Sequence, residues 1–377
     1  MNKIIGFLVV FGLLAIIVYL VVAKRELPSP PSATDSTDSM NVVTEADRVE
    51  VVAKNLEVPW AIAFLRDGKM LVTERRGTVQ LISKDGKATQ VAQIKNVKQF
   101  SESGLHGIAL HPKFEENRFV YLYYTYGEGI GQTLNRVVRM SFDGNSLKDE
   151  KIIVDKIPGA PNHDGGRIKF GPDGFLYITT GDAQEPSSSQ EENSLAGKIL
   201  RVTDEGSPAP GNPFENSVYS YGHRNPQGIT WDESGNLWET EHGPSGGSLG
   251  TGNDEINKIE SGKNYGWPTI QGDQTKEGME TPLKNSTKDI AWAPAGAAFI
   301  GNSLFFGGLR GQTLYEAVIQ NGQIIDFKEH LKGEFGRIRE VIVGPDNMLY
   351  MTTSNRDGRG FPKAEDDKIL KINPTKL

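Results

Sequence analysis

The sequence predicts an all-β protein, a six-bladed β-propeller preceded by an N-terminal hydrophobic helix. Two series of strand-like segments each recur six times and alternate along the chain, as expected for a ring of multi-stranded blades. A further strand-like segment precedes the first repeat. The 43 glycines and 20 prolines among 377 residues favour a turn-rich β protein over a helical bundle.

The first series is a hairpin, in which two apolar runs are joined by a tight turn. In the third copy the turn is Pro172-Asp173-Gly174, where proline presets φ and glycine adopts a positive φ. The six copies occupy residues 64–72, 111–122, 168–178, 231–238, 300–306 and 343–350.

The second series is a single strand with alternating side chains, such as Lys198-Ile199-Leu200-Arg201-Val202. This alternation predicts a strand with one face packed against the next blade. The six copies occupy residues 77–82, 135–140, 197–202, 254–259, 311–315 and 367–372. A β-sandwich is the alternative fold, but a sandwich does not require two series that stay in step.

A propeller must close its ring. Residues 49–53 are predicted to pair with the strand at 368–372 and so to complete the last blade, which covers an otherwise open sheet edge. The propeller domain is therefore expected to occupy residues 49–374.

The N-terminus is predicted to contain a membrane segment. Residues 4–23 carry no charge and are flanked by Lys3 and by Lys24-Arg25. This length matches a membrane-spanning helix and exceeds a signal-peptide core of roughly 7–15 residues. We expect residues 1–25 to be an anchor or signal segment and residues 26–48 to be a disordered linker. The propeller would then be anchored to the cell membrane on the extracytoplasmic side, or secreted if the segment is cleaved.

Charge and cysteine content exclude several functions. The formal net charge of −7, without a concentrated basic stretch, argues against a nucleic-acid partner. The absence of cysteine excludes disulfides, thiolate metal sites and cysteine nucleophiles.

His163 is the first candidate for catalysis. It lies in the glycine-flanked loop 162–167 at the start of a strand, where a ligand can approach closely. Asp182 follows the second strand of the same hairpin and is placed to orient the imidazole. A structural histidine and a turn-capping aspartate are the alternatives that remain open.

Three further segments have residue types that bind ligands. Residues 221–228 group Arg, Asn and Gln donors, which suit carboxylates or carbonyls, or satisfy their own backbone. Residues 239–244 and 253–255 are rich in oxygen ligands, which suit calcium rather than a transition metal. Arg337 and Arg339 lie two apart on a strand and share a face, either as an anion clamp or as solvated charges.

Together these segments resemble the soluble quinoprotein aldose (glucose/sorbosone) dehydrogenases, six-bladed propellers that use pyrroloquinoline quinone. The resemblance runs from about Val51 to Ile372 and preserves the order and spacing of the family's motifs. Its most specific carriers are Val58-Pro59-Trp60, Gly104-Leu105, His111-Pro112, Asn162-His163, residues 222–228, Glu255-Ile256-Asn257 and residues 264–268.

The resemblance implies oxidation of the anomeric carbon of aldose sugars to lactones, with an external electron acceptor. His163 would be the general base. Arg224 and Asn225 would face the quinone carbonyls, and Arg224 would stabilise the oxyanion of the reduced cofactor.

Calcium is implied as a second cofactor. The backbone carbonyls of Gly243 and Pro244 would hold the calcium ion that polarises the quinone. Glu255 and the carbonyl of Tyr265 resemble a second, structural calcium site.

The cofactor's carboxylates would pair with Arg310, Arg337 and Arg339, which match basic positions of the family. Two positions depart from the family pattern. Glu102 stands where the glucose-active relatives carry Gln near the cofactor. Arg310 replaces a lysine, which keeps the charge but not the geometry.

Two other classes of function fit the same architecture. A calcium-dependent, lactonase-type hydrolase would show a calcium-bound water and no bound quinone. A non-catalytic propeller would bind a protein or glycan partner. The presence of His163 together with Arg224 and the two C-terminal arginines argues against the second class.

Overall fold

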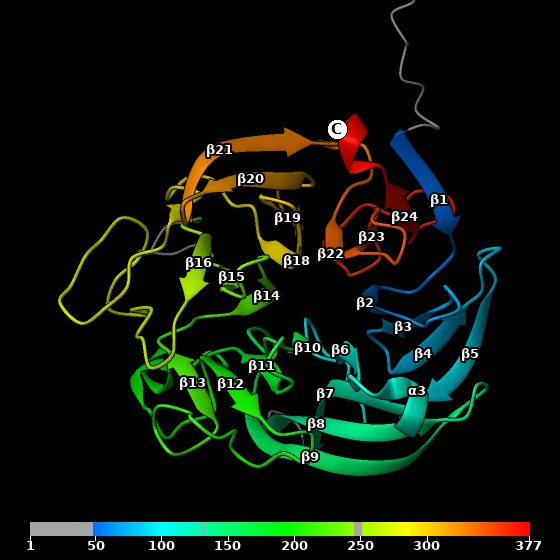
Figure 1. The fold of residues 1–377 in the computed structure, drawn as a ribbon, viewed down its shortest axis with the longest axis horizontal. Coiled ribbons are helices and arrows are strands. Elements are labelled where there is room, and N and C mark those ends of the chain that lie inside the picture. Colours follow the sequence, from blue (N-terminus) through cyan, green and yellow to red (C-terminus); the bar gives the residue numbers. More distant parts are fainter. Residues whose placement is uncertain (1–47, 130–131, 245–250) are drawn as a thin grey trace, which may run out of the picture. The chain divides into compact units, whose positions relative to one another are not determined.

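The computed structural model describes residues 48–129, 132–244 and 251–377. These residues form six four-stranded antiparallel sheets, arranged as blades around a common axis (Figure 1). This arrangement confirms the predicted six-bladed β-propeller.

Each blade takes its strands in order from the axis outwards (Figure 1). The first two blades are β2 (Pro59–Phe64), β3 (Met70–Glu74), β4 (Thr78–Ile82), β5 (Ala88–Gln93), and β6 (Leu105–Leu110), β7 (Phe119–Gly129), β8 (Gln132–Phe142), β9 (Leu147–Gly159). The next two are β10 (Ile168–Phe170), β11 (Leu176–Thr180), β12 (Lys198–Val202), β13 (Val218–Tyr221), and β14 (Pro226–Trp231), β15 (Leu237–Glu241), β16 (Glu255–Ile259), β17 (Lys284–Asn285). The last two are β18 (Pro294–Ile300), β19 (Ser303–Gly308), β20 (Leu314–Gln320), β21 (Gln323–His330), and β22 (Ile338–Val343), β23 (Leu349–Thr353), β24 (Ile369–Ile372), β1 (Val49–Ala53).

The first described strand closes the ring. β1 pairs antiparallel with β24, with Val49 opposite Ile372 and Val51 opposite Leu370. The N-terminal strand is therefore the outer strand of the sixth blade, as predicted, and the edge of β24 is covered.

The two sequence repeats correspond to fixed positions in the blades. The first series contains the turn between the first and second strands, and the second series contains the third strand. The outer strands β5, β9, β13, β17 and β21 have no counterpart in either series. Outer strands face solvent on much of their surface, so their apolar pattern is weak; no residue of β21 is fully buried.

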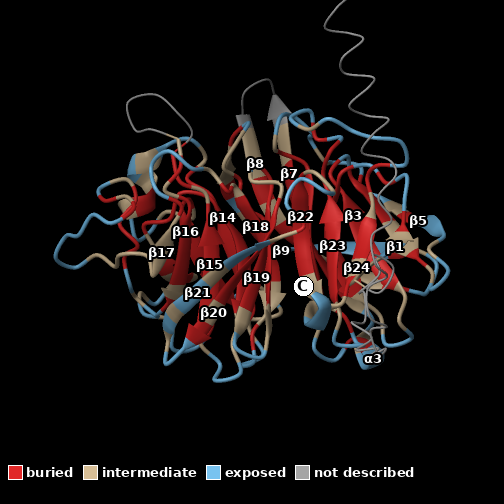
Figure 2. Cartoon of the chain, turned by 90° about the horizontal axis from the view of Figure 1, so that it is seen from above, coloured by how far each residue is buried: buried red, intermediate tan, exposed pale blue. Residues whose placement is uncertain are grey.

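Apolar clusters lie at the interfaces between neighbouring blades, six among the described residues. In β3, Leu71 packs towards the second blade and the next residue, Val72, packs towards the sixth. The third strands pack against the next blade as predicted, and their other face is covered as well: in β12, Ile199 packs towards the fourth blade and Leu200 towards the second. Each blade has a neighbour on both sides, so both faces of its inner strands are covered (Figure 2).

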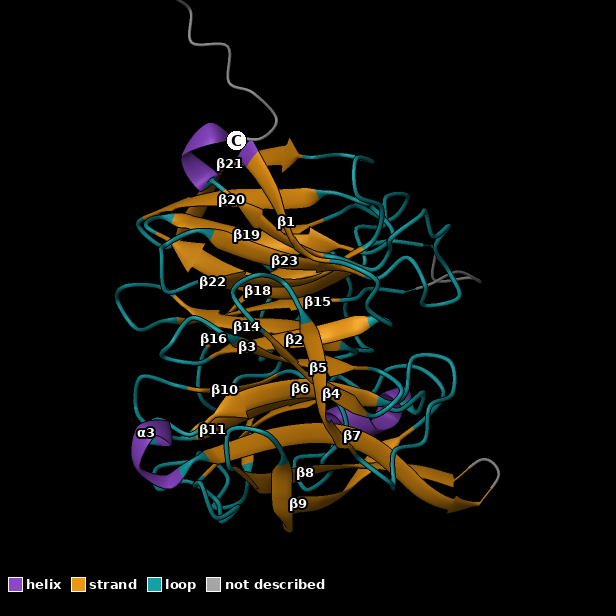
Figure 3. Cartoon of the chain, turned by 90° about the vertical axis from the view of Figure 1, so that its right-hand side faces the viewer, coloured by secondary structure: helices purple, strands orange, loops and turns teal. Residues whose placement is uncertain are grey.

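Among the described residues, helix is confined to short segments (Figure 3): α3 (Phe114–Asn117) and the 3-10 turns η1 (Pro186–Gln190) and η3 (Pro374–Lys376). Within the part of the chain that the structure describes, no helix has the length and apolar character needed to cross a membrane. The predicted hydrophobic helix and anchor (residues 1–25) and all of the predicted linker except Arg48 lie outside the described residues.

Candidate active site

The inner hairpins of the blades bring their loops together. In an antiparallel hairpin, residues that precede the first strand lie beside residues that follow the second. His163 precedes β10 and Asp182 follows β11, and the equivalent loops of the other blades join them around a cavity of about 960 Å³. Its charged and imidazole side chains are those of Arg75, Glu102, His163, Asp182, Arg224, His242, Arg310, Arg337, Arg339, Asp357 and Arg359.

Two hydrogen bonds determine which ring nitrogen of His163 carries the proton. Its Nε2 lies 2.9 Å from Arg224 Nη2, and a guanidinium can only donate. Nε2 is therefore the acceptor, and the proton is on Nδ1, which lies 2.7 Å from Asp182 Oδ1. The imidazole thus has its lone pair on Nε2, in the form that a general base requires.

The loop that carries His163 is held on both sides. The carboxylate of buried Asp164 accepts hydrogen bonds from Ser103 Oγ (2.8 Å), Asn135 Nδ2 (2.9 Å) and one backbone N–H. Burial raises the pKa of Asp164 to about 6, although these donors oppose the shift. On the other side, a Cβ at Gly181 would lie 1.8 Å from the carbonyl oxygen of His163, so the close approach of these loops requires glycine.

Positive charge exceeds negative charge in the cavity. Six arginines and three acidic residues line it, which leaves three positive charges in excess. The buried Nε atoms of Arg75, Arg224 and Arg339 have no hydrogen-bond partner among the described residues. Burial lowers the pKa of Arg339 to about 9. Buried guanidiniums with incomplete partners suit the binding of an anion.

Arg337 and Arg339 lie in the same wall of the cavity. Arg337 Nε donates to Asp357 Oδ2 (2.8 Å) and its Nη1 donates to the carbonyl of Leu309 (3.0 Å). Arg339 Nη1 donates to Gln227 Oε1 (2.7 Å). Both arginines are less than one-tenth exposed, so the alternative of solvated surface charges does not hold.

Arg310 and Asn225 are two further residues predicted to contact the cofactor. Arg310 is part of the cavity wall and directly follows Leu309, whose carbonyl accepts from Arg337 Nη1. Asn225 is not among the lining residues; its Oδ1 accepts the N–H of Gly165 (3.0 Å), and its buried Nδ2 has no partner in the described part of the chain. The oxygen of Asn225 therefore supports the His163 loop, and the contact of its unpartnered Nδ2 with the quinone stays a prediction.

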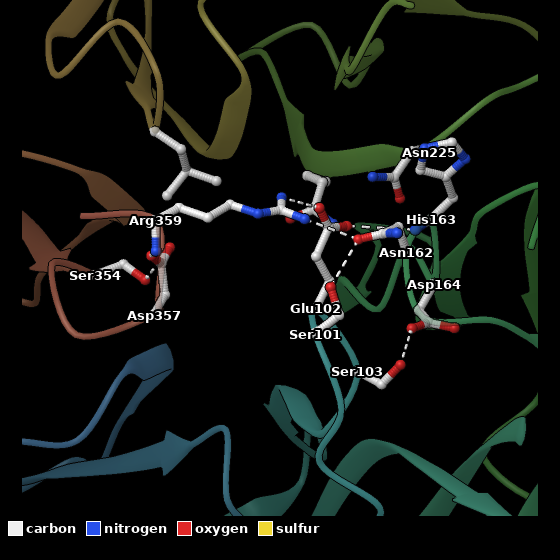
Figure 4. Close-up of polar contacts among 12 residues, drawn as sticks. Ser101, Glu102, Ser103, Asn162, His163, Asp164, Asn225, Ser354, Asp357 and Arg359 are labelled. Atoms are coloured by element: carbon white, nitrogen blue, oxygen red, sulfur yellow. Dashed lines mark hydrogen bonds and ion pairs between the residues drawn. The ribbon is translucent and has the colours of Figure 1, made fainter. Parts of the chain in front are cut away.

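Glu102 lies at the cavity and contacts the His163 loop (Figure 4). Its Oε1 is paired with Arg359 Nη1, and its Oε2 accepts the backbone N–H of His163 (3.3 Å). Burial would raise the pKa of Glu102, but the charges of His242 and Arg359 and the Arg359 hydrogen bond lower it to about 2.

A buried acidic cluster lies beside Arg224 in the fourth blade. His223, Glu239 and Glu241 place ligand atoms within 4.8 Å of one another. Glu255 is opposite Glu241 in the β15–β16 ladder, and Glu241 Oε2 accepts the N–H of Arg224 (3.0 Å). Burial raises the pKa of Glu241 to about 8, and burial with repulsion from Glu241 raises that of Glu239 well above its usual range.

This cluster fits a cation. Three buried atoms of this cluster lack hydrogen-bond partners among the described residues: His223 Nδ1, Glu239 Oε1 and Asn257 Oδ1. Tyr265 borders the cluster, with its ring stacked on His223 at 4.9 Å between centroids. Carboxylates buried together are stabilised by a bound metal ion, and a set rich in oxygen suits calcium.

The predicted calcium carbonyls lie just beyond β15. The N–H of Gly243 donates to Asp254 Oδ1 (2.9 Å), and the other oxygen of Asp254 accepts two further backbone N–H groups. Pro244 lines the cavity, and its carbonyl accepts the N–H of Gly252 (3.1 Å). A carbonyl oxygen has two lone pairs, so Pro244 retains one for a cation.

Comparison with known proteins shows the family of this chain. The family model for glucose / sorbosone dehydrogenase matches residues 56–363. The chain belongs to the glucose/sorbosone dehydrogenase family. It is 30% identical to aldose sugar dehydrogenase YliI of Escherichia coli (strain K12), over 86% of this chain and 92% of the relative. It is also 30% identical to quinoprotein glucose dehydrogenase B of Acinetobacter calcoaceticus, over 71% of this chain and 62% of that protein.

A solved structure of the same family has the same fold. The PQQ-bound form of aldose sugar dehydrogenase from Streptomyces coelicolor has a TM-score of 0.80 and 39% identity, covering 86% of this chain and 97% of that one. The family assignment made from sequence motifs is confirmed. As a member of the glucose/sorbosone dehydrogenase family, the chain is an oxidoreductase.

Among the charged and imidazole side chains that line the cavity of this family member, sequence reasoning did not single out four: Arg75, His242, Asp357 and Arg359. Arg75 directly follows β3 and His242 directly follows β15, the same side of their hairpins as Asp182 after β11. The position directly after each second strand is therefore a sequence signal from which Arg75 and His242 could have been predicted. Asp357 and Arg359 lie farther along the long loop after β23, where spacing gives no such signal.

Proposed function

We propose that this chain oxidises the anomeric carbon of aldose sugars to lactones, with pyrroloquinoline quinone bound in the arginine-lined cavity and electrons passed on to an external acceptor. The observation that carries the proposal is the fixed tautomer of His163, whose Nε2 lone pair lies inside a cavity suited to anions. The sugar dehydrogenases to which the chain is similar support it.

The charge of the cavity agrees with this cofactor. Pyrroloquinoline quinone carries three carboxylates, and the lining side chains have three positive charges in excess. We assign Arg310, Arg337 and Arg339 to these carboxylates, because charge-assisted bonds to guanidiniums are strong in a partly buried site. We assign Arg224 to the quinone carbonyl, beside the base.

The residues around His163 then have defined roles. His163 Nε2 takes the proton of the anomeric hydroxyl, and Asp182 holds the ring and stabilises the positive charge that forms on it. Arg224, which now donates to Nε2, gives way to the sugar hydroxyl and remains beside the developing negative charge. When bound, the quinone supplies the acceptor for the hydride of the same carbon, so the lost hydride and proton account for the lactone.

Calcium is proposed at two places. The carbonyls of Gly243 and Pro244 would hold an ion that supplies Lewis-acid chemistry beside the cofactor. Glu255 and the carbonyl of Tyr265 would hold a structural ion, with further oxygen ligands from Glu239. The unpartnered oxygen of Glu239 supports this second assignment.

We further propose that the propeller acts outside the cytoplasmic membrane, tethered by its N-terminal segment. This proposal rests on the twenty uncharged residues 4–23, which are long enough to span a bilayer. Fractionation of cells that express the full chain, with and without residues 1–25, tests the tether.

One assay separates the proposed dehydrogenase from a hydrolase. The purified protein is incubated with calcium, with or without pyrroloquinoline quinone, and supplied with an aldose and a redox dye or with a sugar lactone. We expect aldose-dependent dye reduction, with lactone as product, only after addition of the quinone. Lactone hydrolysis that needs calcium and no quinone would instead support the hydrolase.

A further inference from the structure

One guanidinium connects three loops at the cavity (Figure 4). Arg359, in the loop after β23, pairs through Nη1 with Glu102 Oε1 and donates through Nη2 to Asn162 Oδ1 (2.8 Å). Glu102 belongs to the loop before β6, and Asn162 belongs to the loop before β10. Arg359 and Glu102 are 257 residues apart in sequence.

The same contacts fix the backbone of His163. Glu102 Oε2 accepts the N–H of His163 (3.3 Å), and Ser101 Oγ donates to Asn162 Oδ1 (2.9 Å). His163 has a φ of 67°, in the left-handed region that non-glycine residues rarely adopt. Residues in such conformations persist only where their surroundings hold them in place.

Arg359 is itself anchored to the cavity wall. Its N–H donates to Asp357 Oδ1 (2.9 Å), while Asp357 Oδ2 accepts from Arg337 Nε (2.8 Å). The carbonyl of Asp357 accepts from Arg75 Nη2 (2.9 Å). The Arg359 side chain therefore reaches Glu102 from a part of the cavity wall that Arg75 and Arg337 hold in place through Asp357.

The pair also changes the charge of the site. Glu102 introduces a carboxylate into a cavity that otherwise suits anions, and a bare carboxylate there would repel an anionic ligand. Arg359 places a positive charge in direct contact with it. The carboxylate of Glu102 and the guanidinium of Arg359 thus cancel one another next to the His163 loop.

We propose that Arg359 is a positioning residue of this site: it neutralises Glu102 and, through Glu102 and Asn162, clamps the loop that carries His163. The alternative is an ordinary surface ion pair, since the Arg359 side chain is 52% exposed, and most exposed pairs contribute little. The two explanations differ in what removal of Arg359 does to the His163 backbone and to anion affinity.

The clamp is tested by amide hydrogen exchange in the cofactor-free protein. In Arg359→Ala we expect the His163 N–H to exchange at least about tenfold faster than in the parent, a loss of about 1.4 kcal/mol of protection. The matched control is Lys54→Ala, which breaks the ion pair of Lys54 with Glu365 in the same loop (2.5 Å) and should leave that rate unchanged within about twofold. Equal rates in Arg359→Ala and the parent would overturn the proposal.

The neutralising role rests on the proposed function and is tested by affinity for pyrroloquinoline quinone. Arg359→Ala should weaken the affinity about tenfold or more, and Glu102→Gln in the same chain should restore it to within about threefold, because no bare carboxylate remains. Parent affinity in Arg359→Ala, or no recovery in the double variant, contradicts this role. If the parent itself binds no quinone, the proposed function fails, and hydrogen exchange still decides on the clamp.

Discussion

The indole Nε1 of Trp267 donates to Asp182 Oδ2 at 2.9 Å, while Asp182 Oδ1 faces the Nδ1 of His163. Each oxygen of this buried carboxylate therefore has its own donor, and the carboxylate cannot turn without losing one of them. Asp182 is thereby fixed as the partner that keeps the proton of His163 on Nδ1.

Asp182→Asn should lower turnover by roughly 10–10²-fold, less than the loss of the base itself. An amide can accept from only one of the two donors and opposes the other with its own N–H groups. Quinone affinity should change little, since Asp182 carries none of the proposed cofactor contacts. Asp346→Asn, a turn residue that binds Tyr350 and Lys371 in the sixth blade, is the control. Equal turnover in both variants would contradict the orienting role.

Hairpin geometry explains why this part of the site could be predicted. His163 and Asp182 are only 19 residues apart and flank one hairpin, so a local pattern was enough to place them together. The contact of Glu102 with Arg359 joins loops of different blades, and no local pattern encodes it. The hydrogen bond from the N–H of Gly165 to the oxygen of Asn225 is likewise a contact that sequence spacing does not reveal, while the contact of its Nδ2 with the cofactor stays a prediction.

The fold was predictable for a similar reason. The inner and third strands are buried at every blade interface, so their apolar patterns recur along the chain. The outer strands are partly solvated and their sequences vary. For this reason β5, β9, β13, β17 and β21 could not be recognised from the sequence repeats. β1 was the exception, because the ring must close and only one strand-like segment precedes the first blade.

Arg337→Ala and Arg339→Ala should weaken quinone affinity by more than about tenfold, while turnover at saturating quinone falls much less. Both guanidiniums are buried in the cavity wall, where an ion pair with a ligand is poorly screened. Arg139→Ala removes a remote ion pair with Glu205 and serves as control. Affinities that stay within about twofold of the parent for both variants would assign the cofactor's carboxylates to other residues.

Removal of calcium should lower the melting temperature and prevent reconstitution with quinone, and calcium should restore both. Without a cation, burial and mutual repulsion keep Glu239, Glu241 and Glu255 largely protonated, and a calcium ion that replaces those protons stabilises the folded fourth blade by binding to it. Thermal unfolding in the presence of a chelator, followed by addition of single metal ions, measures this. Recovery with zinc and not with calcium would contradict the assignment of oxygen-ligand calcium sites.

The ionised state of Glu102 should be visible in the pH dependence of stability. Its pKa is about 2 in the folded protein against an ordinary 4.5, so the unfolded chain binds the proton more tightly. The stabilisation is complete above pH 4.5 and is lost as pH falls towards 2. Between pH 5 and pH 3 the parent should lose about 2 kcal/mol more free energy of unfolding than Glu102→Gln. Parallel pH profiles of the two proteins in denaturant unfolding would show that Glu102 is not stabilised as a carboxylate.

The most direct test of the whole account is reduction of the bound quinone by sugar. The parent and His163→Ala are each loaded with pyrroloquinoline quinone and calcium, freed of oxygen, and mixed with excess aldose while the quinone absorbance is recorded. We expect both proteins to bind the quinone, the parent to reduce one quinone per chain, and the variant to do so about 10²–10⁴ times more slowly. A parent that binds no quinone, or a variant that reduces it at a rate within a few-fold of the parent, would contradict the assignment of His163 as the base of a quinone-dependent sugar dehydrogenase.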